Sequence, residues 1–202
     1  MAYDPAATRE RILTSALQEF AAYGLAGARV DRIALNARAN KESIYRYFGN
    51  KEQLLDRVLS EYLRTNGDGV SPQADKLDKY VAELFRHHRA HPEFLRLCLW
   101  EGLERSDGLT PEALRVRQGH YDDKLAAIRA AQADGSVDPA LDPRHLLVVL
   151  LGMVNYWFAV PQIVRLVFGE APDDELFTRH EEFLHECYRR LTAVPGQPDE
   201  SP

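Results

Sequence analysis

The side chains with the most recognisable chemistry lie together in the segment KESIYRYFGNK, residues 41–51. Helical spacing predicts a short helix here whose polar face carries Lys41, Glu42, Ser43 and Arg46. An arginine can donate two hydrogen bonds to a guanine edge, and a glutamate can accept one from cytosine N4, although phosphate groups would repel it. The segment therefore has the chemistry needed to read base edges in the major groove of DNA.

Two short helices must hold this polar face in place. An apolar stripe predicts the first helix over residues 30–37, with its inward face formed by Val30, Ile33, Ala34 and Ala37. Asn40 is the expected N-cap of the second helix, residues 41–48, because its side chain can accept a hydrogen bond from a free backbone N–H. Helices this short are not stable alone, so they must pack on longer neighbours.

The longer neighbours are predicted on both sides of the pair. Apolar residues recur at helical spacing from about residue 5 to residue 23, and Gly24 supplies a stop signal. After a turn at Gly49, the side chains of Asn50 and Gln53 are spaced as a capping box for the next helix. A core shared by these helices would leave the polar face of residues 41–48 exposed.

The whole chain reads as all-α, with an N-terminal three-helix helix-turn-helix domain followed by a second helical domain. Residues 65–74 are rich in Gly, Asn, Ser and Pro and predict a linker. Further helices are expected at about 74–91, 92–105, 111–134, 143–168 and 173–192. We therefore expect a first domain over residues 1–64, a second over 65–194, and a disordered tail at 195–202.

A larger set of residues between positions 8 and 55 has a characteristic spacing: Thr8-Arg9, Ile12-Leu13, Ala16-Leu17, Phe20, Gly24, Ile33-Ala34, Lys41, Ser43, Ile44, Tyr45, Phe48, Lys51 and Leu54-Leu55. In this spacing the segment, about a quarter of the chain, resembles the DNA-binding domain of the TetR family. The resemblance implies a homodimeric, ligand-responsive transcriptional regulator, in most cases a repressor released from a palindromic operator by a small apolar or amphipathic molecule. An activator, or a ligand-independent DNA-binding dimer of the same fold, is the alternative.

The resemblance also implies contacts to the DNA backbone by Tyr45, Tyr47 and Lys51. Lys51 lies at a helix N-terminus, where free N–H groups favour phosphate. The sequence departs from the family at Arg38, where a turn usually contains Gly, and at Arg29, where Ser or Thr commonly caps the helix. We expect either a strained left-handed backbone at Arg38 or a different turn. We expect Arg29 to contact phosphate instead of capping.

The second domain is expected to bind the small molecule and to form the dimer. Apolar residues at helical spacing, with a few polar groups among them, are the expected lining of a pocket: Phe94, Leu97, Trp100, Gln118, Tyr121, Leu125, Met153, Asn155, Tyr156 and Trp157. The resemblance implies that the last two helices pair with those of a second subunit, which would explain an apolar helix over residues 143–168. Which of its aromatic residues face the pocket is left open, and plain core packing is the alternative for the whole set.

Composition narrows the partners and the compartment. The 202 residues carry a net charge of −6, but residues 1–60 carry +2 and the remainder −8, so the first segment suits DNA. The longest apolar run is shorter than a bilayer span, and the N-terminus lacks a secretory signal, so we expect a cytoplasmic protein with no membrane partner. Cys98 and Cys187 are too few for a disulfide framework and are expected to be ordinary packing residues.

Other kinds of site are weakly supported by the sequence. His87 and His91 are four residues apart and could share a metal ion, but no third ligand is placed nearby, so no metal and no cofactor is expected. Motifs typical of hydrolases, metalloproteases and nucleotide-binding enzymes are missing, so we expect no enzyme and assign no catalytic residue. A pure interaction module with an inactive helix-turn-helix is the remaining alternative, which a DNA titration would separate.

Overall fold

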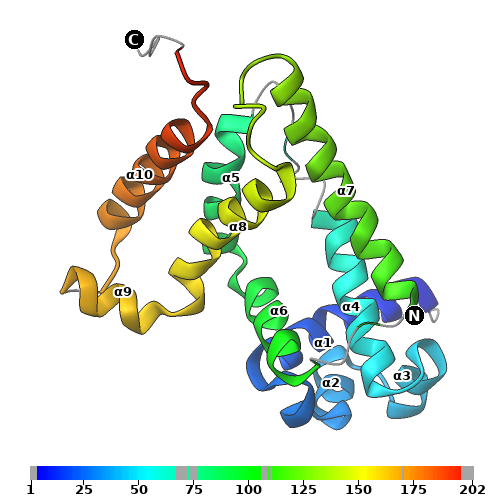
Figure 1. The fold of residues 1–202 in the computed structure, drawn as a ribbon. Coiled ribbons are helices and arrows are strands. Elements are labelled where there is room, and N and C mark those ends of the chain that lie inside the picture. The colour runs from blue at the N-terminus through cyan, green and yellow to red at the C-terminus, as the bar shows by residue number, and fades with distance from the viewer. Residues whose placement is uncertain are drawn as a thin grey trace. The chain divides into compact units, whose positions relative to one another are not determined.

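The computed structural model describes residues 4–66, 72, 77–105, 109, 111–169 and 171–196. Regular structure in these ranges consists of helices α1 to α10, as Figure 1 shows. The chain divides into two compact units, Met1–Asp68 with His91–Gln118, and Gly69–Ala90 with Gly119–Pro202. The all-α prediction is confirmed.

The first unit contains α1 (Pro5–Gly27), α2 (Val30–Ala37), α3 (Lys41–Phe48), α4 (Lys51–Asn66), α6 (Pro92–Glu104) and the start of α7 (Pro111–Ala133). Its core brings together apolar faces of α1, α2, α3, α4 and α6, among them Ile12, Phe20, Ile33, Ile44, Leu54 and Leu97. Residues 91–118 were expected in the second domain, whereas here α6 packs against α1. Helices α1 to α4 alone make a small core, and α6 enlarges it.

Local signals set the helix ends in this unit. Asn40 Oδ1 accepts the N–H of Ser43 at 2.7 Å, which confirms the predicted N-cap of α3. Gln53 Oε1 accepts the N–H of Asn50 at 2.9 Å and Asn50 Oδ1 accepts the N–H of Gln53 at 2.8 Å, which confirms the capping box of α4. Gly24 has φ 67° and breaks the helical path of α1, and one further turn follows it to Gly27. The predicted stop is therefore a kink.

The second unit contains α5 (Leu77–Ala90), the rest of α7, α8 (Pro143–Ala159), α9 (Pro161–Phe168) and α10 (Asp174–Thr192). Helix α5 packs against both α8 and α10. The core that they enclose includes Tyr80, Phe85, Ile128, Leu150, Val154, Trp157, Leu184 and Tyr188. Parts of the predicted linker, residues 67–71 and 73–74, and of the predicted tail, residues 197–202, lie outside the described residues.

The prediction of one helix over residues 143–168 is wrong. Helices α8 and α9 meet at Val160 with a bend of 82°. Pro161 has no N–H to continue the α8 ladder, and its ring disfavours the α conformation in the preceding residue, so Val160 takes φ −132° and ψ 61°. Within the described ranges, no single helix is both long enough and apolar enough to cross a membrane. Taken together, the bent pair α8 and α9 has that length and composition.

Candidate nucleic-acid interface

Helix α3 is fixed by the residues on its inner face. Ile44 and Phe48 are 1% and 7% exposed and belong to the same core as Ile33 of α2. Because this face is buried, the opposite face of α3 is open to solvent, with the exposed side chains Lys41, Glu42, Tyr45 and Arg46. A helix anchored in this way presents a rigid polar surface.

The predicted base-reading residues do not all lie on that surface. Glu42 and Arg46 are exposed as expected. Lys41 is exposed and its amino group lies 2.9 Å from the Asp31 carboxylate of α2. Ser43, in contrast, is buried, because its position faces inward beside Ile44, and its Oγ accepts a 3.3 Å hydrogen bond from Arg46. Ser43 therefore faces the core and accepts a hydrogen bond from Arg46, instead of facing solvent.

The two tyrosines of α3 differ in their surroundings. Tyr45 is 46% exposed. Tyr47 is half-buried and lies edge-on to Phe48. The guanidinium of Arg46 lies over the Tyr47 ring, 5.2 Å from its centroid. Contacts with Ser43 and Tyr47 thus hold the Arg46 guanidinium, which restricts its orientation.

Lys51, at the start of α4, has internal contacts. Its amino group donates to the carbonyl oxygens of Ala28, at 3.2 Å, and Ala26, at 3.5 Å. These bonds tie the connection between α1 and α2 to the N-terminus of α4. An ammonium group has three N–H donors, so two carbonyl contacts leave one donor for an external acceptor.

A residue that the sequence analysis missed caps α2. The Glu19 carboxylate of α1 is 4% exposed and accepts both the backbone N–H of Arg29 and the Nε–H of Arg32, each at 2.8 Å. The side chain of Arg29 makes no capping bond and is exposed. The carboxylate from α1 therefore accepts the N–H of the N-cap residue, as the glutamate of a capping box does, and it fixes α2 against α1 directly.

The turn between α2 and α3 has the strained geometry that the sequence allowed. Arg38 adopts φ 50° and ψ 46°, in the left-handed region, and is the non-glycine residue with positive φ in the described part of the chain. A side chain with a Cβ atom is disfavoured there by about 1–2 kcal/mol. The turn keeps the expected geometry although it lacks glycine.

Polar contacts of α6 complete the first unit. The Glu104 carboxylate accepts the N–H groups of Leu25, at 2.5 Å, and Ala26, at 3.2 Å, just after the kink in α1. Arg105, at the end of α6, lies 2.6 Å from the Asp56 carboxylate of α4, and both side chains are 12% exposed. These charges come from distant parts of the sequence, which is why no local pattern revealed them.

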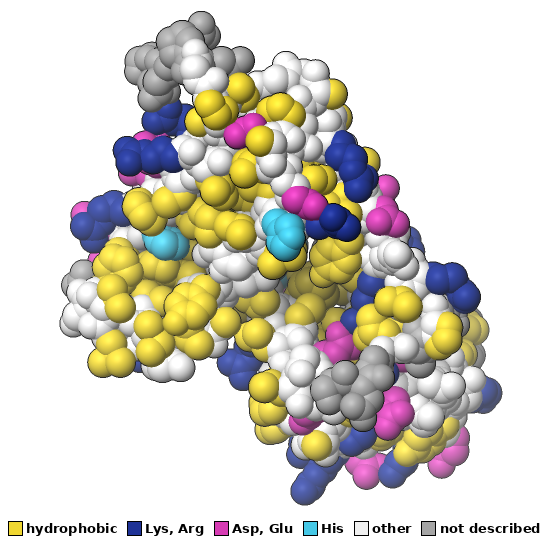
Figure 2. All heavy atoms as spheres, in the orientation of Figure 1, with side chains coloured by type: hydrophobic (Ala, Val, Ile, Leu, Met, Phe, Trp, Pro, Cys, Tyr) yellow, Lys and Arg dark blue, Asp and Glu magenta, His cyan; other side chains and the backbone are white. Residues whose placement is uncertain are grey.

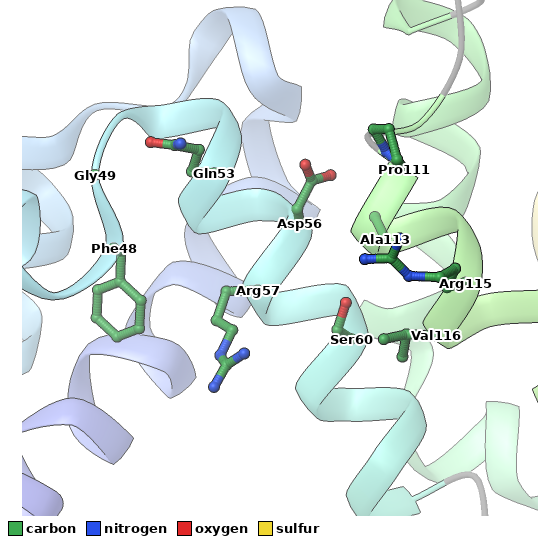
Figure 3. Close-up of a pocket in the computed structure, with 10 residues that line it drawn as sticks. All are labelled: Phe48, Gly49, Gln53, Asp56, Arg57, Ser60, Pro111, Ala113, Arg115 and Val116. Atoms are coloured by element: carbon green, nitrogen blue, oxygen red, sulfur yellow. The ribbon is translucent and has the colours of Figure 1, made fainter.

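A hollow of about 620 Å³ opens in the first unit between α4 and the start of α7. Figure 3 shows Asp56 and Ser60 of α4 on one side and Arg115 and Val116 of α7 on the other. The predicted ligand-binding residues are not part of its lining.

The structure divides the predicted ligand-binding residues between the two units. Phe94, Leu97, Trp100 and Gln118 belong to the first unit, where Phe94 stacks on Tyr62 with 4.1 Å between ring centroids. The others belong to the second unit: Trp157 is in its core, Leu125 and Met153 pack against that core, Asn155 is half-buried, and Tyr121 and Tyr156 are exposed. The ten residues therefore fall into two groups, each within one unit.

One of the two cysteines has the surroundings of a packing residue. Cys98 packs against the first core, and burial raises the pKa of its thiol to about 12. Among the residues that the structure describes, no three His, Cys, Asp or Glu side chains are grouped to hold a metal ion. His87 and His91 thus carry no metal proposal.

Two family models match the chain. Residues 12–58 match the family described as bacterial regulatory proteins, tetR family, and residues 76–190 match the tetracyclin repressor-like C-terminal domain. The chain is 42% identical over 168 residues to the HTH-type transcriptional repressor SCO4008 of Streptomyces coelicolor, covering 83% of this chain and 87% of that protein. It is 32% identical over 159 residues to the HTH-type transcriptional repressor NicS of Pseudomonas putida, covering 74% and 75%.

A solved structure is also similar. SCO4942 from Streptomyces coelicolor matches with a TM-score of 0.79 and 34% identity, covering 93% of this chain and 99% of that one. A helix-turn-helix joined to a second helical unit defines a DNA-binding transcriptional regulator, a class of protein that is not enzymatic. The chain belongs to the TetR family of these regulators.

Proposed function

We propose that this regulator is a homodimeric repressor that binds a near-palindromic operator through α3 and leaves it when a small molecule binds the second unit. The observation that carries the proposal is the exposed polar face of α3, anchored by the buried Ile44 and Phe48. The repressors SCO4008 and NicS, which are similar over most of this chain, support the direction of regulation. Such a protein would act in the cytoplasm, where the bacterial chromosome lies.

Within this proposal Arg46 and Glu42 read base edges, and Tyr45, Tyr47, Lys51 and Arg29 contact the DNA backbone. Arg46 is held by Ser43 and Tyr47, so little orientational freedom is lost when it docks on a guanine. Lys51 is tied to two carbonyl groups and can reach only a phosphate close to the N-terminus of α4.

Two alanine variants separate these roles. Arg46→Ala is expected to weaken binding to the specific operator by about 1–3 kcal/mol while leaving non-specific affinity nearly intact, because base contacts specify. Lys51→Ala is expected to weaken all duplexes similarly and to lower the salt slope by about one unit, because one phosphate contact is lost. Arg129→Ala, which removes an exposed charge from α7 in the other unit, is the control. Equal losses on both kinds of DNA for both variants would contradict the division of roles.

The proposed dimer uses α8 and α10. Their exposed apolar side chains include Val148 and Phe183, which are 68% and 60% exposed. In Figure 2 the hydrophobic side chains of the second unit gather most plainly at α9, the helix that follows α8. An apolar surface of this kind is stabilised by contact with a second copy.

Aspartate substitutions at both positions test the dimer without removing core residues. Val148→Asp with Phe183→Asp is expected to give a monomer at micromolar concentration in light scattering, with the helical circular dichroism signal kept. Glu182→Lys changes an exposed charge next to Phe183 and is the control for surface charge. A double variant that remains dimeric would place the interface elsewhere.

Release requires that the ligand prefer the form that does not fit DNA. Two recognition helices must be about 34–36 Å apart to enter successive major grooves. A ligand that prefers the non-binding form by about 1.4 kcal/mol weakens DNA binding at most tenfold, and DNA weakens the ligand by the same factor. The ratio of ligand affinities measured with and without operator should therefore equal the ratio of operator affinities measured with and without ligand.

A further inference from the structure

The turn between α2 and α3 places an arginine in a backbone conformation that favours glycine. The N–H of Arg38 donates to Leu35 O at 3.2 Å. The N–H of Ala39 donates to Ala34 O at 3.0 Å, which closes the end of α2. A helix that ends in this way needs a left-handed residue, which is usually glycine because glycine has no Cβ atom. The hydrogen bonds of the turn therefore account for φ 50° and ψ 46° at Arg38, but not for the choice of arginine.

The Arg38 side chain has no polar contact that would offset this strain. It is exposed, and in the part of the chain that the structure describes it makes no hydrogen bond, ion pair or ring contact. Strained backbone conformations of residues other than glycine cluster at functional sites, where the strain is retained for a purpose. A strained guanidinium group with five unused N–H donors therefore indicates a ligand outside the chain.

A second arginine reaches the same turn from α1. The Nε–H of Arg11 donates to the carbonyl oxygen of Ala37 at 3.1 Å, and its Nη2 donates to Thr8 Oγ1 at 3.0 Å. Ala37 directly precedes Arg38, so both arginines lie at the end of α2. Both partners of Arg11 are uncharged, and they use two of its five N–H donors. The bonds thus hold a second cation beside the turn without neutralising it.

The neighbouring carboxylates have other partners. Asp31 of α2 lies 2.9 Å from the amino group of Lys41. The Asp4 carboxylate accepts backbone N–H groups in the first turn of α1. Among the residues that the structure describes, neither Arg11 nor Arg38 forms an ion pair. The two exposed arginines therefore suit an anion, and a planar guanidinium group can donate two parallel hydrogen bonds to a phosphate.

The position of the turn identifies the source of the phosphate. In a helix-turn-helix the first helix crosses the DNA backbone and the second enters the major groove, so the turn between them lies at the edge of the groove. The exposed face of α3 begins at Lys41, three residues after Arg38. A phosphate of the DNA backbone at this edge is thus the anion closest to both arginines when α3 enters the groove.

We propose that Arg38 and Arg11 together bind one backbone phosphate of the DNA, at the edge of the groove that α3 enters. This inference rests on the proposed function, in which α3 reads the operator. Neither arginine is among the DNA-binding residues predicted from the sequence. The strain at Arg38 is retained because the phosphate contact strengthens DNA binding, at a cost to the stability of the free protein.

Three substitutions separate the charge of Arg38 from the strain of its backbone. Arg38→Gly removes both, and Arg38→Asn removes the charge while keeping a side chain that tolerates the left-handed region. Arg38→Lys keeps both the charge and the strain. The full-length protein would be titrated with a fluorescent duplex of random sequence at several salt concentrations, because a phosphate contact does not depend on sequence. Melting temperatures would be measured on the same samples.

The expected result is that DNA affinity and stability change in opposite directions. Arg38→Gly and Arg38→Asn should weaken binding about three- to tenfold and lower the salt slope by about one unit, because a phosphate contact is lost. Arg38→Gly should also raise the melting temperature by about 1–2 °C, because the strain is relieved. Arg38→Lys should keep the slope and the melting temperature. Arg129→Gln, which removes one exposed positive charge from α7 in the other unit, is the control and should change neither.

The salt slope decides against a purely structural arginine. If Arg38→Gly and Arg38→Asn have the same salt slope as Arg129→Gln, Arg38 binds no phosphate and the proposal is wrong. Weaker binding with a lower melting temperature and an unchanged slope would likewise show that the arginine only shapes the turn.

Arg11→Gln tests the second cation. The amide nitrogen of glutamine lies the same number of bonds from the backbone as Nε of arginine, so it can still donate to the Ala37 carbonyl. We expect about threefold weaker DNA binding and a change in melting temperature of less than about 1 °C. Because both arginines bind one phosphate, Arg11→Gln with Arg38→Gly should lower the salt slope by about one unit in total. Unchanged binding by Arg11→Gln, or a loss of about two units in the double variant, would contradict a shared phosphate.

Arg46→Ala distinguishes this inference from the proposed function. Loss of sequence preference in Arg46→Ala, with unchanged salt slopes in the Arg38 variants, would support base reading by α3 and contradict the phosphate site. Lower salt slopes in the Arg38 variants, with no sequence preference in the unmodified chain, would support the phosphate site and contradict the reading of an operator.

Discussion

Replacing Glu19 tests how the sequence holds the recognition pair of helices in place. Its carboxylate is almost completely buried and accepts the first free N–H of α2, from Arg29, and the Nε–H of Arg32. Glu19→Ala removes the acceptor from both donors. The Arg29 N–H is part-buried, whereas the Arg32 side chain is 35% exposed and can return to water. The loss of stability should therefore come mainly from the unpaired Arg29 N–H at the N-terminus of α2.

The magnitude follows from the contacts. A hydrogen bond to a charged group contributes about 1.5–3 kcal/mol, and an exposed ion pair contributes about 0–1 kcal/mol. We therefore expect Glu19→Ala to lower the free energy of unfolding by about 2–4 kcal/mol. Glu19→Gln keeps a carbonyl oxygen that can accept the Arg29 N–H, so we expect it to cost about 1–2 kcal/mol.

Urea unfolding followed by circular dichroism measures both variants. Glu10→Ala, which removes an exposed carboxylate from the same helix, is the matched control and should change stability by less than about 0.5 kcal/mol. We expect Glu10→Ala to have the highest urea midpoint, Glu19→Gln a lower one and Glu19→Ala the lowest. If Glu19→Ala unfolds at the same urea concentration as Glu10→Ala, the carboxylate does not cap α2 and the reasoning is refuted.

The remaining predictions concern a strained turn and buried imidazoles. Arg38→Gly should stabilise the protein by about 0.5 kcal/mol, because relief of the left-handed backbone exceeds the added entropy of glycine, and a lower melting temperature would contradict this. Burial holds the pKa of His88 and of His180 at about 4, below the usual 6.5, so the unfolded chain binds more protons between these values. Stability should therefore fall as the pH drops from 6.5 to 4, by about 3 kcal/mol at most from His88, whose ring is near His87 and Lys124. Urea midpoints measured at pH 7 and pH 4.5 check this, and equal midpoints would show that the imidazoles are not buried as neutral groups.

Features that depend on a few neighbouring residues were predictable from the sequence. The caps at Asn40 and Asn50 involve partners three residues away, and both hydrogen-bond as predicted. The break at Pro161 had an equally local signal, but the apolar pattern continues on both sides of it and favoured one helix. Periodicity in this case outweighed the proline, although the backbone cannot continue α8 through it.

Features that depend on tertiary contacts were not predictable. Glu19 looks like a polar interruption of an apolar stripe until α2 folds against it, and Asp56 meets Arg105 from 49 positions away. Lys124 and His88 have the composition of ordinary surface residues, and only the packing of α5, α7 and α8 shows that they are buried. Ser43 was predicted on the exposed polar face of α3 and is buried. A helix as short as α3 does not show from its sequence which face Ser43 lies on until the core is known.

Whether α3 reads an operator is tested most directly by letting the full-length protein select duplexes from a random DNA library in the presence of competitor DNA. We expect a near-palindromic sequence whose half-sites are spaced by about one helical turn or a multiple of it, since two α3 helices must enter successive major grooves. We also expect Arg46→Ala to lose the preference for the selected sequence at a defined base pair in each half-site. Recovery of no sequence above the competitor, or of a sequence whose preference is unchanged by Arg46→Ala, would contradict the claim that α3 reads the operator.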